Sequence, residues 1–174
     1  MKPKSIVVVV AVVAVIGLLA YGLLNKSESS LAIGETAPDK ELPRLGTPGT
    51  GAIADYRGKW VLVNFWASWC EPCRSESPEL EQFQNAHAKS GFTVLGINLF
   101  DTTDDALNFV HRYGLTYPQL RESGGDDRKD AYGMTGFPES FLINPQGKIA
   151  LIVRGPVDTS YLDHHVAPMI RTPS

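Results

Sequence analysis

Two cysteines, Cys70 and Cys73, are the only ones in this chain of 174 residues, and Glu71 and Pro72 separate them. Thiols at this spacing serve three purposes in proteins. They form a short structural disulfide, contribute half of a zinc site, or make a redox centre that exchanges a disulfide with another protein. Each purpose requires something different of the surrounding sequence.

A structural staple and a metal site are poorly supported by the rest of the sequence. A disulfide that closes so short a loop removes little chain entropy from the unfolded state, so it stabilises a fold little. Zinc normally takes four ligands, and the only histidines are His87, His111 and the adjacent pair His164 and His165. Adjacent residues of a helix point about 100° apart, so that pair makes a poor chelate. We predict no metal site and no cofactor besides the cysteine pair.

The redox interpretation depends on where the expected elements place the pair. Lys59–Trp66 is an apolar run typical of a strand buried on both faces, and Glu71–Ser90 is expected to form a helix. Cys70 then lies at a helix N-terminus, where unpaired backbone N–H groups and the helix dipole favour a thiolate. We therefore predict Cys70 as the nucleophile and Cys73, one turn further on, as the thiol that resolves the mixed disulfide.

The rest of the chain predicts further alternation of strands and helices. Thr102, followed three residues later by Asp105, is a helix N-cap signal, and Gly114 ends that helix. Strands are expected at Phe92–Asn98, Tyr117–Arg121, Ser140–Asn144 and Lys148–Arg154, and a last helix at Asp158–Arg171. This order predicts one α/β domain with parallel crossover units first and a β-hairpin at the end.

The N-terminal segment differs from the rest in having no charged residue between Ser5 and Leu24. A helix of about 20 residues is roughly 30 Å long, the thickness of the hydrocarbon core of a bilayer. Because Lys2 and Lys4 precede the segment, the positive-inside rule places the N-terminus in the cytoplasm and the rest of the chain outside. We predict an uncleaved anchor at 1–25, a tether or hairpin at 26–52 and the main domain at 53–174. A signal peptide cleaved after Ala32 is the alternative.

The composition narrows the range of partners. The formal net charge is −3 at pH 7, and no cluster of basic residues indicates a nucleic-acid partner. The segment predicted to lie outside the cytoplasm has no cysteine other than Cys70 and Cys73. In an oxidising compartment, a domain that works in the reduced state then has no other thiol to pair with wrongly.

Two segments of the sequence resemble the thioredoxin superfamily. One is the strand followed by Trp69-Cys-Glu-Pro-Cys73 and a helix, and the other is Gly136-Phe-Pro-Glu-Ser-Phe-Leu-Ile-Asn144. The resemblance implies a thioredoxin-like α/β fold, with a central mixed sheet flanked by helices. It also implies a cis peptide bond before Pro138, which would lie against the cysteines and present the backbone around Phe137 to an extended substrate. A proline at a strand edge is the simpler alternative for Pro138.

The resemblance also points to the residues that would contact a protein substrate. These are Trp69, Glu71, Pro72, Phe137 and Pro138. Pro72 suits the first turn of a helix, where its missing N–H would have no acceptor. Glu71, if ionised beside the thiols, would destabilise the thiolate and make the couple more reducing. It would otherwise be an exposed charge that partners recognise.

Asn64 and Glu76 distinguish this chain from cytoplasmic thioredoxin. Thioredoxins carry a buried aspartate on the strand before the motif, where this chain has Asn64, which cannot act as a base. Glu76 lies three residues after Cys73, on the same face of the helix. If buried, its carboxyl would have a raised pKa and could take the proton of the resolving thiol. We predict Glu76 as the third catalytic residue; a solvated helix charge is the alternative.

The motif and the anchor together are similar to a narrower group, the TlpA-like extracytoplasmic thiol-disulfide oxidoreductases. Trp-Cys-Glu-Pro-Cys with a glutamate soon after resembles the ResA type, and Gly-x-Pro-Glu-Ser-Phe-Leu-Ile resembles the CcmG (DsbE) type. The resemblance implies a single-pass protein of a bacterial cell membrane that reduces a protein disulfide, that of apocytochrome c, during cytochrome c maturation. It also implies a membrane electron donor that reduces the pair again.

Other functions of the same fold require different residues around the reactive cysteine. Peroxiredoxins normally carry threonine three residues before the reactive cysteine, and this chain has Ala67 there. A copper-binding or metallochaperone domain is an alternative of a different class, although related folds use a wider cysteine spacing. Reduction of other envelope or spore proteins is an alternative within the redox class, and the sequence does not separate it from reduction of apocytochrome c.

Overall fold

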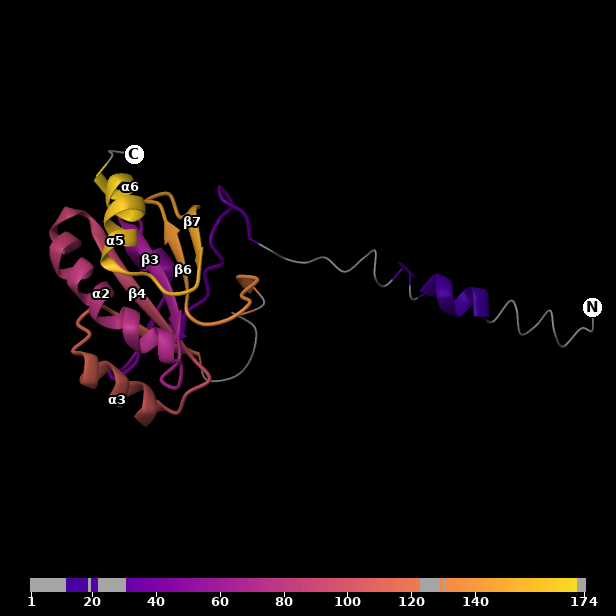
Figure 1. Ribbon diagram of the computed structural model, residues 1–174, viewed down its shortest axis with the longest axis horizontal. Coiled ribbons are helices and arrows are strands. Elements are labelled where there is room, and N and C mark those ends of the chain that lie inside the picture. The colour runs from indigo at the N-terminus through magenta and orange to yellow at the C-terminus, as the bar shows by residue number, and fades with distance from the viewer. Residues whose placement is uncertain (1–11, 19, 22–30, 123–128, 130, 172–174) are drawn as a thin grey trace, which may run out of the picture.

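β3 (Trp60–Trp66) is the central strand of a five-stranded mixed sheet in the order β5-β4-β3-β6-β7 (Figure 1). The other strands are β4 (Phe92–Leu99), β5 (Gln119–Glu122), β6 (Glu139–Ile143) and β7 (Ile149–Arg154). β4 runs parallel to both β3 and β5, whereas β6 is antiparallel to β3 and β7. The predicted parallel units followed by a hairpin are confirmed. The computed structural model describes residues 12–18, 20–21, 31–122, 129 and 131–171.

Three helical stretches pack against one face of this sheet. They are α2 (Glu71–His87), α3 (Thr103–Tyr113) and a C-terminal run of α5 (Thr159–Tyr161), a π-helical turn (Leu162–Val166) and α6 (Ala167–Arg171), with a short 3-10 turn (Ala88–Ser90) after α2. Side chains alternate along β3, so Leu62 and Trp66 join the core beneath the helices. The indole of Trp66 stacks on Phe109 of α3, with ring centroids 4.5 Å apart.

The opposite face of the sheet is covered by the segment that precedes β3. A small hairpin of β1 (Leu42–Pro43) and β2 (Thr50–Gly51) and a 3-10 turn (Ile53–Tyr56) make up this cover. Ala37 and Leu42 pack there with Val63 and Phe65 of β3. Isolated bridges join Thr36 to Lys148 and Arg44 to Leu120. Part of the stretch predicted as tether or hairpin is therefore packed into the folded unit.

Local signals in the sequence set most element boundaries. Thr102 caps α3 by accepting a hydrogen bond from the Asp105 N–H at 3.1 Å, and Gly114 ends the helix with φ of 61°. α2 runs through Pro78 without interruption. β5 starts at Gln119, two residues later than predicted, because Pro118 has no N–H to donate to a neighbouring strand.

The N-terminal prediction falls mainly on residues 1–11, 19 and 22–30, which lie outside the described part of the chain. Residues 12–18 and 20–21 are helical, with exposed side chains. In the described ranges, the structure contains no helix with both the length and the apolar character needed to cross a membrane. The membrane anchor and its orientation stay predictions.

Candidate active site

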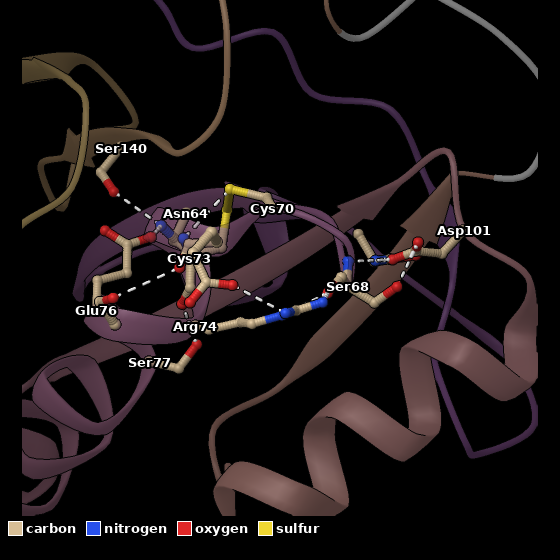
Figure 2. Close-up of a disulfide and its surroundings, with 12 residues drawn as sticks. Asn64, Ser68, Cys70, Cys73, Arg74, Glu76, Ser77, Asp101 and Ser140 are labelled. Atoms are coloured by element: carbon tan, nitrogen blue, oxygen red, sulfur yellow. Dashed lines mark hydrogen bonds and ion pairs between the residues drawn. A yellow bond between two sulfur atoms is a disulfide. The ribbon is translucent and has the colours of Figure 1, made fainter.

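Cys70 and Cys73 form a disulfide at the start of α2, with their Cα atoms 5.3 Å apart (Figure 2). Cys70 is the N-cap residue, and its sulfur accepts a hydrogen bond from the Cys73 N–H at 3.2 Å. Cys70 is 5% exposed and Cys73 is fully buried. Cys70 is thus the sulfur nearer to solvent and the one at the positive end of the helix, as the predicted nucleophile requires.

Hydrogen bonds of Ser68 fix the turn that leads to Cys70. The Ser68 N–H and hydroxyl donate to the two carboxylate oxygens of Asp101 at 2.7 and 2.8 Å. Its carbonyl accepts two hydrogen bonds from the Arg74 guanidinium at 3.1 and 3.0 Å. Figure 2 shows this contact on one side of the disulfide and Glu76 on the other. Every polar group of Ser68 is therefore bound to a neighbouring element.

Asp101 is a site residue that sequence reasoning missed. It follows β4, at the same edge of the sheet as the end of β3. The carboxyl ends of adjacent parallel strands are where α/β folds collect functional side chains, so this position was the available signal. The acidic residues Asp104 and Asp105 lie a few positions further on in α3, and nothing local distinguishes Asp101 from them.

Glu76 is buried behind the cysteines, with 1% of its surface exposed. One carboxylate oxygen accepts from the Asn64 side-chain amide at 2.8 Å, and the other accepts from the Val157 N–H at 3.1 Å. Burial raises the pKa of Glu76 to about 7, against the opposing effect of these two hydrogen bonds. The burial on which the predicted proton transfer from Cys73 depends is therefore present, and the alternative of a solvated charge is wrong.

Asn64 connects this carboxylate to β6, the strand that follows Pro138. Its side-chain amide also donates to the Ser140 hydroxyl at 3.1 Å, and the two residues are cross-strand partners in β3 and β6. Asn64 therefore sits where thioredoxins carry their aspartate, but it serves as a hydrogen-bond donor to Glu76.

The Phe137–Pro138 peptide bond is cis, as the resemblance implies. The loop before it is bound by Glu139, which is 1% exposed. One Glu139 oxygen accepts from the Thr135 N–H and hydroxyl, both at 2.8 Å, and from the Gly136 N–H at 3.1 Å. The other oxygen pairs with Arg154 at 2.6 Å. The buried Glu139 carboxylate, paired with the exposed Arg154, thus fixes the loop that carries Phe137.

Aromatic side chains lie next to the disulfide. The Trp69 side chain is 58% exposed, and its ring meets the half-buried Phe137 edge to face, with centroids 5.7 Å apart. Phe137 in turn meets Phe100, which is 48% exposed, at 6.1 Å. Sequence reasoning selected Trp69, Phe137 and Pro138, and the structure brings them together. Sequence reasoning did not select Phe100.

Glu71 is exposed at the first turn of α2, beside the exposed Pro72. The carboxylate of Glu71 pairs with Arg74 at 2.9 Å. An exposed carboxylate that already has a cationic partner exerts little field on the sulfurs, because solvent and the guanidinium both screen it. Of the two interpretations of Glu71, the structure favours the exposed surface charge.

The described residues hold no group of three or more His, Cys, Asp or Glu side chains that could bind a metal ion. His87 lies in α2 with its ring tilted against Phe83, whereas His165 stacks on Tyr161 in the C-terminal run. The residues at the described site are suited to thiol chemistry, with a proton acceptor and an aromatic surface beside the disulfide.

Comparisons with known proteins agree with this geometry. The model of the AhpC/TSA family matches residues 33–152. The thiol-disulfide oxidoreductase ResA of Geobacillus thermodenitrificans is 31% identical over 160 residues, covering 92% of this chain and 91% of that protein. The thiol:disulfide interchange protein HelX of Rhodobacter capsulatus is 35% identical over 147 residues, covering 84% of this chain and 81% of that protein.

A solved structure shares both fold and sequence with this chain. It is a thiol:disulfide interchange protein DsbE of Chlorobium tepidum, with a TM-score of 0.74 and 34% identity, covering 81% of this chain and 99% of that one. The thioredoxin-like fold inferred from two short motifs is confirmed over most of the chain. The protein therefore belongs to the AhpC/TSA family of thioredoxin-like proteins, as a protein thiol-disulfide oxidoreductase.

Proposed function

We propose that this protein is a membrane-anchored reductant of protein disulfides outside the cytoplasm, acting on apocytochrome c during cytochrome c maturation. The observation that carries the reductase chemistry is the buried Glu76 carboxyl, one helical turn from Cys73 and with its pKa raised to about 7 by burial. The similarity to proteins named ResA, HelX and DsbE supports the choice of substrate.

The reaction begins with the reduced form of the pair. The Cys70 thiolate attacks one sulfur of the substrate disulfide, whose S–S bond breaks as a mixed disulfide with Cys70 forms. The departing substrate thiolate takes a proton from solvent. Cys70 is suited to this step because it lies at the helix N-terminus and is the less buried sulfur.

Release of the substrate requires a second thiolate. Cys73 passes its proton to the Glu76 carboxylate and attacks the sulfur of Cys70, which closes the disulfide seen in this structure. The second substrate sulfur leaves as a thiolate and is protonated. The substrate has then gained two electrons and two protons, and the enzyme dithiol has become a disulfide. A membrane dithiol donor returns the pair to its reduced form.

A trapping experiment tests the substrate. In Cys73→Ala, the mixed disulfide on Cys70 cannot be resolved, so the substrate stays covalently bound to the enzyme. We expect apocytochrome c among the trapped proteins when the full-length variant is produced in cells that are making cytochrome c. Trapped proteins are identified by non-reducing electrophoresis and mass spectrometry.

The double variant Cys70→Ala/Cys73→Ala is the matched control and should trap nothing. Capture of other envelope proteins, with apocytochrome c never found, would reject the proposed substrate and leave the disulfide chemistry standing. Failure to trap any protein would reject the proposed reductase function.

A further inference from the structure

Phe100 has a backbone conformation and an exposure that the fold does not require. Among the described residues other than glycine, only Phe100 has a positive φ, which is 63°. A side chain with a Cβ is strained in this left-handed region, and a large apolar side chain that is 48% exposed gains little from burial. A strained residue that contributes little to the core indicates a functional role.

The neighbouring residue holds Phe100 in place. Asp101 accepts hydrogen bonds from the Ser68 N–H and hydroxyl and, at 2.5 Å, from the Asn98 side chain. The Asp101 carbonyl accepts from Arg121 at 2.7 Å. With Leu99 buried on one side and Asp101 bonded on the other, the backbone of Phe100 is fixed to the turn that carries Cys70.

Three aromatic side chains meet at Phe137, each from a different loop. Trp69 directly precedes Cys70, Phe137 precedes the cis proline, and Phe100 follows β4. Phe137 contacts both of the others edge to face, so they form one continuous apolar surface, which we call the aromatic rim. Exposed apolar surfaces of this kind mark sites of interaction, and aromatic residues supply much of the binding energy at such sites.

We propose that Phe100 determines substrate specificity by completing a binding surface for an apolar side chain of the substrate. The occupant is an extended segment of the disulfide-containing protein, whose reacting cysteine must approach Cys70 at the edge of the rim. Alternate side chains of an extended segment point the same way, so the residue two positions from that cysteine faces the aromatic rim. This inference rests on the proposed reductase function and deepens it.

Peptide reduction by the full-length, reduced protein tests the proposal. Two disulfide-linked peptides differ only at the position two residues from the reacting cysteine, where one carries leucine and the other serine; glutathione disulfide is the small substrate. We expect the wild type to prefer the leucine peptide about tenfold in kcat/KM, the usual gain from partly burying one such side chain. Phe100→Asn should abolish this preference through KM, so that the leucine and serine peptides are reduced with equal kcat/KM.

Asparagine is chosen because it tolerates a positive φ, so the variant should keep or raise the thermal unfolding midpoint. Ile33→Asn is the matched control. Ile33 is 65% exposed, and it precedes the bridge from Thr36 to Lys148, at the end of the sheet away from the cysteines. Its replacement should leave the leucine preference unchanged. Retention of the leucine preference in Phe100→Asn would overturn the role of Phe100 and leave the proposed reductase function standing. Inability of the wild type to reduce any of the three disulfides would overturn the proposed function and this inference with it.

Discussion

At the scale of single residues, Glu76 links the position of a carboxyl to the chemistry of a thiol. A glutamate in solution would be ionised at neutral pH and could not hold a proton taken from Cys73. Burial raises the pKa of Glu76 to about 7, so near neutral pH the same group both accepts and returns a proton. The hydrogen bonds from Asn64 and Val157 oppose this shift and keep the carboxylate form accessible.

The pH dependence of stability should report this buried carboxyl. The folded state keeps the Glu76 proton up to about pH 7, whereas the unfolded chain releases it near the ordinary glutamate pKa of 4.5. Stability therefore falls as pH rises from about 4.5 to 7, by about 3 kcal/mol in total, and is level above that window. Urea unfolding of wild type and Glu76→Gln between pH 4 and pH 9 measures this slope, which the variant should lack.

Catalysis should change with the same substitution. Glu76→Gln should slow the resolving step about 100-fold at pH 7, the usual contribution of general acid–base catalysis, and leave alkylation of Cys70 in the reduced protein unaffected. Equal pH profiles of exchange for the two proteins would contradict the role of Glu76 as proton acceptor.

At the scale of elements, the contact between Asp101 and Ser68 joins the loop after β4 to the turn before α2. It links two segments whose positions decide where Cys70 and Phe100 lie. Each segment alone is a short loop with few backbone hydrogen bonds of its own. Their mutual contact, with Arg74 on the Ser68 carbonyl, substitutes for regular structure at the active-site edge.

Removal of this contact should destabilise the protein. Asp101→Ala removes the acceptor of three hydrogen bonds and should lower the free energy of unfolding by about 2 to 4 kcal/mol. Ser68→Ala removes only the hydroxyl and should cost about 1 kcal/mol. Chemical denaturation of the oxidised proteins measures the free energy of unfolding of both variants. An equal decrease in the two variants would show that the hydrogen bonds from the Ser68 N–H and from Asn98 to Asp101 contribute nothing to stability.

At the scale of the whole molecule, one edge of the sheet carries the entire site. The ends of β3 and β4 and the start of β6 meet there, because β3 lies between its parallel and antiparallel neighbours. Residues 31–56 close the face of the sheet opposite the helices. The catalytic groups described here therefore depend on the folded unit and not on the N-terminal segment.

The predicted anchor should affect location and leave chemistry unchanged. The full-length chain should sediment with membranes and resist alkaline extraction, as expected for a helix of about 20 apolar residues. A variant without residues 1–25 should be released, with the same unfolding midpoint and the same rate of glutathione disulfide reduction. Full-length protein in the soluble fraction would contradict membrane anchoring.

The sequence alone predicted the features that depend on short stretches of chain. The apolar run of β3, the cap at Thr102, the glycine at the end of α3 and Pro72 in the first turn of α2 each act within a few residues. The spacing of Cys70 and Cys73 and the position of Glu76 one turn later are likewise local. Helical periodicity was sufficient to place Glu76 on the same face as Cys73.

Only the tertiary structure decided what surrounds these residues. The burial that raises the Glu76 pKa comes with an N–H donated by Val157, from the segment between β7 and α5, and Asn64 is a donor from β3. The roles of Asp101 and Phe100 come from contacts between loops distant in the chain. Such contacts depend on the packing of the sheet and helices, which no short stretch of sequence specifies, so the redox pair was predictable and the surface that would receive its substrate was not.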